Sequence, residues 1–170
     1  MRHGEQNGGL SMANYAIRPL KYRDLPKLLK LAHAYWKFEN IQGFSPKQYQ
    51  RLAVKILKNP SLGRIWIAVE RNRLIGYLVV VFLMSLEYGG IAAEIDELYV
   101  ESSERGRGVG GALLKAAGKT LLRKGVGQVS LRVGKSNSQG IRFYKNLGFR
   151  KRNEFLVMDR KKKKGDCEAP

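Results

Sequence analysis

The chain has 170 residues and a formal net charge of +18, with 32 Lys and Arg against 14 Asp and Glu. Hydrophobic residues make up 44% of the sequence and charged residues 27%, a balance typical of one globular domain and not of a disordered chain. One cysteine excludes an intramolecular disulfide, and with only two histidines we expect no metal centre. The longest uncharged apolar run, Leu74 to Leu86, has 13 residues, whereas a membrane span needs about 20. Because no export signal opens the sequence, we expect a cytoplasmic protein.

Taken in chain order, the hydrophobic pattern predicts one α/β domain with a mixed sheet. Apolar residues spaced by three or four indicate helices, and alternation indicates strands. We expect a disordered leader at 1–12, the domain at 13–159 and a disordered basic tail at 160–170. The expected elements are a strand at 15–20, helices at 25–36 and 49–57, strands at 64–70, 74–86 and 92–100, a helix at 109–124, a strand at 128–133, a helix at 139–147, and one or two strands within 149–159.

The charge is distributed unevenly along this domain. Eight of the fifteen residues from Arg150 to Lys164 are basic, whereas the segment from Glu87 to Glu97 has four acidic residues and no basic one. A strongly basic protein attracts polyanions such as nucleotide phosphates and nucleic acid. On such a protein, the acidic segment predicts either carboxylates paired with neighbouring basic groups or a pocket for a cationic amine.

A glycine-rich turn, Arg105-Gly106-Arg107-Gly108-Val109-Gly110-Gly111, lies between an expected strand and an expected helix. Glycines let backbone N–H groups approach an anion, and a helix N-terminus adds partial positive charge. It is not a P-loop, because no Lys-Ser/Thr pair follows Gly110. Nor does it follow the first strand of a βαβ unit, as a dinucleotide fold requires. The glycine-rich turn therefore indicates either a phosphate site of another kind or only a tight turn.

Three separated motifs agree in order and spacing. They are Leu98-Tyr99-Val100 with Arg-x-x-Gly-x-Gly at 105–110, then Asn137-Ser138-Gln139, then Phe143-Tyr144-Lys145-Asn146-Leu147-Gly148-Phe149. Their arrangement resembles the GNAT superfamily of acyl-CoA-dependent N-acetyltransferases, over roughly residues 13–159. The resemblance implies a single GNAT-like α/β domain whose mixed, mostly antiparallel sheet of six to seven strands is flanked by about four helices. It also implies direct acetyl transfer from acetyl-CoA to a primary amine in a ternary complex.

The resemblance assigns a cofactor site to these motifs. Backbone amides of the turn bind the CoA pyrophosphate, and the strand at 98–100 pairs with pantetheine as a neighbouring strand would. That strand and the one beginning at Gln128 diverge, and the acyl end of the cofactor enters the gap. The cofactor-binding residues expected in this way are Leu98, Tyr99, Val100, Arg105, Gly106, Arg107, Gly108, Val109, Gly110, Gly111, Asn137 and Tyr144.

The transfer requires a base for the amine and an acid for the departing thiolate. The resemblance gives the acid role to Tyr144, whose alternative role is packing its helix against the sheet. Strand alternation places Glu94 and Asp96 on one face and Glu97 on the other, unless a bulge intervenes. By resemblance to polyamine- and aminoglycoside-modifying members, Asp96 is the first choice of base; Glu94, where histone-type members carry a carboxylate, is the second. Glu97 is the third choice and requires a bulge, and a plain surface role is the alternative for each of the three.

The acceptor is less defined than the cofactor. The acidic segment favours a small cationic amine, and a protein lysine or N-terminus is the alternative. Trp36, Phe38, Phe44 and Tyr88 are candidates for the acceptor pocket's walls, although the helical spacing of Trp36 favours a place in the core. Two further hypotheses stay open: nucleic-acid binding through the basic tail, and an acyl-CoA sensor without turnover. The sequence also leaves a homodimer open.

Overall fold

The computed structural model describes residues 14–154 and 156–158, so the expected leader and basic tail lie outside the described residues. The chain divides into two compact units. The first ends at Gly134 and contains the sheet, and the second begins at Lys135 and contains the helix α4 (Ser138–Asn146).

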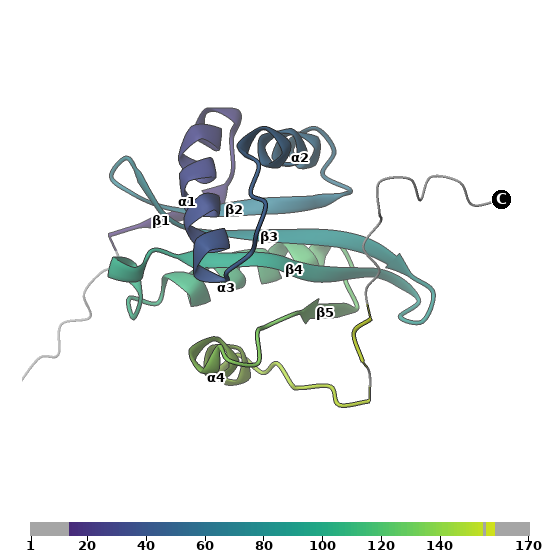
Figure 1. Cartoon of the computed structure of the whole chain (residues 1–170). Coiled ribbons are helices and arrows are strands. Elements are labelled where there is room, and N and C mark those ends of the chain that lie inside the picture. Colours follow the sequence, from purple (N-terminus) through teal and green to yellow (C-terminus); the bar gives the residue numbers. More distant parts are fainter. Residues whose placement is uncertain (1–13, 155, 159–170) are drawn as a thin grey trace, which may run out of the picture. The chain divides into compact units, whose positions relative to one another are not determined.

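The first unit is built on a five-stranded mixed sheet with the order β1-β2-β3-β4-β5 (Figure 1). Neighbouring strands are antiparallel except for β4 and β5, which are parallel. The strands are β1 (Ala16–Pro19), β2 (Gly63–Glu70), β3 (Arg73–Ser85), β4 (Gly90–Val100) and β5 (Gln128–Leu131). The helices of this unit are α1 (Leu25–Phe38), α2 (Pro46–Lys58) and α3 (Val109–Arg123), with short 3-10 turns η1 (Tyr22–Asp24) and η2 (Ser102–Glu104).

The α/β class, the mixed and mostly antiparallel sheet and the four α-helices are confirmed, but the expected number of strands is wrong. The sheet has five strands and not six or seven, because no strand forms in the described part of 149–158. Charged and polar residues fill 150–154, so this segment has no apolar face to bury against a sheet. Leu156, Val157 and Met158 are exposed. Within the described residues, no helix is both long and apolar enough to cross a membrane.

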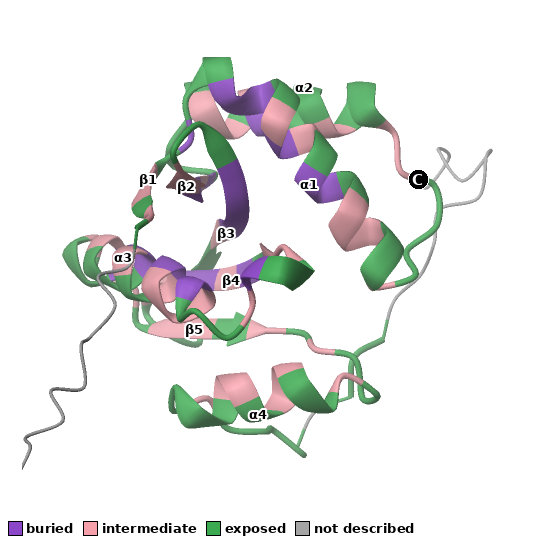
Figure 2. Cartoon of the chain, turned by 90° about the vertical axis from the view of Figure 1, so that its left-hand side faces the viewer, coloured by how far each residue is buried: buried purple, intermediate pink, exposed green. Residues whose placement is uncertain are grey.

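Helices cover both faces of the sheet. Figure 2 shows α1 and α2 over one face and α3 over the other, with the buried residues of the strands between them. On the first face, Leu28 of α1 belongs to one core cluster with Ile67, Tyr77 and Val79. Residues of the strands that point the other way, such as Leu78 and Val80, are also fully buried. This burial on both faces explains why β3 is an almost unbroken apolar run.

Candidate active site

A β-bulge in β4 determines where the three candidate carboxylates point. Val79 of β3 lies opposite Glu97, but the next residue, Val80, lies opposite Ile95, so Asp96 is an extra residue in β4. Glu94 lies opposite Val81, which packs against the core cluster under α1 and α2, and Val79 belongs to that cluster. The bulge that Glu97 requires as a candidate is therefore present, and it places Glu97 on the same face of the sheet as Glu94.

The Glu97 carboxylate is buried beneath α1 and α2 and accepts three hydrogen bonds. Trp36 Nε1 donates to Oε1 at 3.0 Å, while the hydroxyls of Tyr49 and Tyr77 donate to Oε2 at 2.5 and 2.8 Å. Burial raises the pKa of Glu97, and the three donors partly oppose that rise. Burial also raises the pKa of both tyrosines, which keeps them protonated and able to donate.

Sequence reasoning missed Tyr49 and Tyr77 as partners of Glu97. The sequence does indicate that such partners exist, because a carboxylate buried on a strand requires hydrogen-bond donors. Tyrosine supplies such a donor from an otherwise apolar side chain. The signal does not say which of the chain's eight tyrosines would be used.

The other two carboxylates differ in their partners. Glu94 is engaged in an ion pair, with its Oε1 2.9 Å from Arg132 Nη2. Asp96 is exposed, and among the described residues no group forms a hydrogen bond or ion pair with it. Partial desolvation raises the pKa of Asp96, the nearby Glu94 carboxylate raises it further, and Arg132 acts in the opposite direction. Of the three carboxylates, Asp96 is therefore the most exposed one, and the one without a partner among the described residues.

The glycine-rich turn leads directly into α3. Gly106 and Gly108 have φ values of 79° and 77°, a region in which residues with a side chain are strained. Gly108 is the residue before the helix and has no side chain that could accept from the first amides of α3. The N–H groups of 109–111 therefore begin the helix without a side-chain cap, an arrangement that favours anions.

The two arginines of this turn have different surroundings. Arg105 Nε donates to the carbonyl of Val100 at 3.1 Å, and its guanidinium carbon lies 4.5 Å from the centre of the Phe38 ring. Arg107 forms an ion pair with Glu70 at 2.6 Å and another with Glu104. Both arginines are among the cofactor-binding residues expected from the sequence, but carboxylates engage the guanidinium of Arg107.

Strand β4 continues beyond the end of its parallel partner. Its pairing with β5 covers four residue pairs and ends at Ile95 and Leu131. The amide of Glu101 donates to Ile75 of β3 at 3.0 Å. Since backbone groups alternate along a strand, those of Leu98 and Val100 point away from β3. The backbone of this part of β4 thus faces the side on which β5 has ended.

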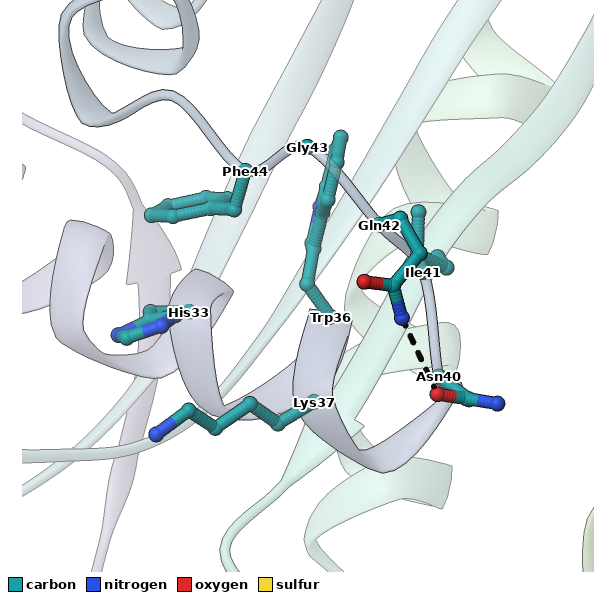
Figure 3. A pocket seen from close by; sticks show the side chains of 8 residues that line it. All are labelled: His33, Trp36, Lys37, Asn40, Ile41, Gln42, Gly43 and Phe44. Atoms are coloured by element: carbon teal, nitrogen blue, oxygen red, sulfur yellow. Dashed lines mark hydrogen bonds between the residues drawn. The ribbon is translucent and has the colours of Figure 1, made fainter.

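A surface pocket of about 420 Å³ lies at the end of α1 in the first unit (Figure 3). It is formed by the C-terminal half of α1 and by the segment that follows, with Trp36 and Phe44 among its walls. Trp36 also bonds Glu97, and the Phe44 ring lies 5.8 Å from that of Tyr49. Phe38 and Tyr88, two other wall candidates, are not among its lining residues.

The second unit contains the two remaining candidate residues. Asn137 caps α4, because its Oδ1 accepts from the amide of Gly140 at 2.8 Å. The half-buried Tyr144 packs edge to face against Phe143 and Phe149, with ring centres 5.2 and 5.6 Å apart. Both ring contacts lie within the second unit, so the role of Tyr144 as an acid stays a prediction, as does the alternative that it packs its helix against the sheet.

Comparison with known proteins places the chain in a family. Residues 25–149 match the acetyltransferase (GNAT) family. An uncharacterized N-acetyltransferase of Methanocaldococcus jannaschii is 28% identical over 150 residues, which are 85% of this chain and 66% of that protein. A spermidine N(1)-acetyltransferase of Thermoplasma acidophilum is 27% identical over 79% of this chain and 87% of that protein. A solved aminoglycoside acetyltransferase from an uncultured soil sample, in complex with sisomicin, shares the fold with a TM-score of 0.72 at 20% identity, covering 88% of this chain and 97% of that one. The chain belongs to the acetyltransferase (GNAT) family.

Proposed function

We propose that the protein transfers an acetyl group from acetyl-CoA directly to a primary amine, with a small cationic amine as the acceptor. One observation carries this proposal. At the end of β4, backbone groups that point away from β3 are followed, after the short turn η2, by a glycine-rich turn and the uncapped N-terminus of α3. Strand-like pairing and anion binding suit the two halves of CoA, an amide-bearing pantetheine arm and a diphosphate.

Within this proposal Asp96 is the base. A base must reach the ammonium of the acceptor, and it works best when its pKa lies closer to neutrality than that of a free carboxyl group. Asp96 combines an accessible carboxylate with a raised pKa. Glu94 is engaged by Arg132, and three donors already occupy Glu97. Trp36 connects the pocket wall to the buried Glu97 carboxylate, whose charge when ionised opposes that of Lys37 in the lining.

Tyr144 is the proposed acid for the departing thiolate, because a phenol stays protonated at neutral pH and can give its proton to a thiolate. The alternative acceptors, a protein lysine or an N-terminus, offer the same ammonium on a larger body. The surface pocket, of about 420 Å³, has the volume for either a free amine or the end of an extended side chain. Nucleic-acid binding through the basic tail falls on residues outside those described.

A substrate screen tests the activity. Purified protein is mixed with acetyl-CoA and, in turn, with polyamines, aminoglycosides, amino acids or basic peptides, and release of the CoA thiol is followed. We expect release that depends on one class of amine. A folded protein that does not bind acetyl-CoA in calorimetry would remove the proposal.

Substitution of the carboxylates then tests the base. Asp96→Asn should abolish turnover while acetyl-CoA still binds, and Glu94→Gln should keep most of the activity. In the active protein, kcat/KM should increase with pH as Asp96 loses its proton, since only the ionised form accepts one. Because the pKa of Asp96 is raised, this increase should lie above the usual Asp value of about 3.9. Equal activity of both variants would show that Asp96 is not the base.

A further inference from the structure

Arg107 is held from three sides within the glycine-rich turn. The Tyr15 hydroxyl donates to its backbone carbonyl at 3.3 Å. Its Nη2 lies 2.6 Å from Glu70 Oε1, and its Nη1 bonds Glu104 Oε2. These contacts come from the residue before β1, from the end of β2 and from η2, so three separate parts of the first unit fix one residue of the turn.

Glu104 is the centre of this arrangement and is nearly inaccessible to solvent, with 6% of its surface exposed. One carboxylate oxygen bonds Arg107 and the other bonds Arg73 at the start of β3. Arg73 in turn lies 3.3 Å from Glu101. With Glu70, the network holds two arginines and three glutamates, so it adds no net positive charge to the turn.

Arg107 lies between two glycines, so the network that fixes it also restricts the backbone of the turn. Gly106 and Gly108 both have positive φ, and glycine gains the most conformational freedom when a chain is released. Fixing the residue between them limits that freedom, so the amides of the turn keep one orientation. A site whose donors are already oriented binds its ligand more tightly, because less ordering is required on binding.

We infer that Arg107 and Glu104 are positioning residues, which orient the amides of the turn for the acetyl-CoA diphosphate, and that the Arg107 guanidinium does not bind the diphosphate itself. This inference rests on the proposed function. It refines the expectation from the sequence, in which Arg107 is one of the cofactor-binding residues.

The two roles predict opposite effects for Glu104→Gln. If Arg107 bound the diphosphate, removing a competing negative charge would free its guanidinium and strengthen acetyl-CoA binding. If the network positions the turn, the same variant weakens binding although it makes the site more positive. The sign of the change in Kd therefore separates the roles.

The experiment is a double-mutant cycle with Glu104→Gln, Arg107→Gln and the combined variant, in the full chain. Calorimetry gives Kd for acetyl-CoA, and each single variant should weaken binding about tenfold, which is about 1.4 kcal/mol. The combined variant should be no weaker than either single one, because both break the same unit. Arg123→Gln is the matched control: it removes the same charge at the end of α3, from a side chain that, among the described residues, bonds only a carbonyl of its own helix.

A second measurement separates positioning from a general loss of structure. Turnover of S-acetylpantetheine, which has the thioester but no diphosphate, should be unchanged in the single variants, while KM for acetyl-CoA rises. If Glu104→Gln does not fold, Glu70→Gln removes only the more exposed partner of Arg107 and should show the same sign. Tighter or unchanged binding in the folded Glu variant would overturn the inference. Absence of acetyl-CoA binding by the unsubstituted protein would instead refute the proposed function.

Discussion

Removal of the Tyr77 hydroxyl is the sharpest test of the buried Glu97 carboxylate. Tyr77 is fully buried, and its hydroxyl donates to Glu97 Oε2 at 2.8 Å. A hydrogen bond to a charged group contributes about 1.5–3 kcal/mol to stability, against about 0.5–1.5 kcal/mol for a neutral pair. Since the Tyr49 hydroxyl still bonds the same oxygen, Tyr77→Phe should cost about 1.5–2 kcal/mol when Glu97 is ionised.

The pH dependence of this cost follows from the direction of the pKa shift. Burial raises the pKa of Glu97, so its contribution to stability is present below the ordinary Glu value of about 4.3 and is lost as pH rises through the folded-state pKa. The Tyr77 hydroxyl lowers that pKa, because it stabilises the ionised form. Without it the pKa rises further, and the variant should lose more stability than the parent protein between low and high pH.

Urea unfolding followed by circular dichroism at about pH 4.3 and pH 8 measures the difference. The cost of Tyr77→Phe should be about 1 kcal/mol or less at the lower pH and larger at the higher. Tyr99→Phe is the matched control, since its ring lies 6.4 Å from that of Tyr77 while its hydroxyl bonds no group among the described residues. An equal cost at both pH values, or a cost no greater than that of the control, would refute the charged hydrogen bond.

Two further predictions concern stability elsewhere in the first unit. Gly63→Ala places its new Cβ 2.3 Å from the carbonyl oxygen of Val80 and should destabilise the protein by about 1–3 kcal/mol. In Gly118→Ala the new Cβ lies in α3 and, among the described residues, meets no atom within 4 Å beyond its chain neighbours and the backbone of its own helix, so this variant should stabilise the protein by about 0.5–1 kcal/mol. Melting temperatures that change in the same direction for both would contradict this geometry. Asp24→Ala removes a buried carboxylate that Arg18 bonds at 2.7 and 2.8 Å, and should cost about 3 kcal/mol at neutral pH. Arg18 lowers the pKa of Asp24, so this cost should fall as pH drops below about 4, and a cost that urea titration finds constant would exclude the ion pair as its source.

Most helices and strands could be predicted from the sequence, because the patterns that indicate them involve only residues close together in the chain. Apolar spacing and glycines at both ends predict a helix at 109–124, and the observed helix α3 spans Val109–Arg123. The last strands could not be predicted in this way. An apolar run such as 155–158 indicates a strand only if a partner edge and a buried face are available. These are properties of the whole fold, and no strand forms in the described residues of that run.

The candidate site was harder to predict than the fold, because it depends on one irregularity. Side chains alternate strictly along a regular strand, so the sequence could state only that a bulge would change which way Glu97 points. The bulge at Asp96 depends on how β4 pairs with β3, which is a long-range property. The identity of the carboxylates was thus predictable, and their division into paired Glu94, enclosed Glu97 and accessible Asp96 was not.

The same limit applies to charge. Counting residues suggests that a turn with two arginines, on a protein of net charge +18, attracts phosphate through its side chains. Two opposite charges that form an ion pair act together as a dipole, and the field of a dipole falls off faster with distance than that of a free charge. Arg107 is in this situation, because it forms ion pairs with Glu70 and Glu104. What remains at the turn is the set of oriented backbone amides, together with Arg105. Affinity for a diphosphate at this turn should therefore depend more on the geometry of the backbone than on the number of basic side chains beside it.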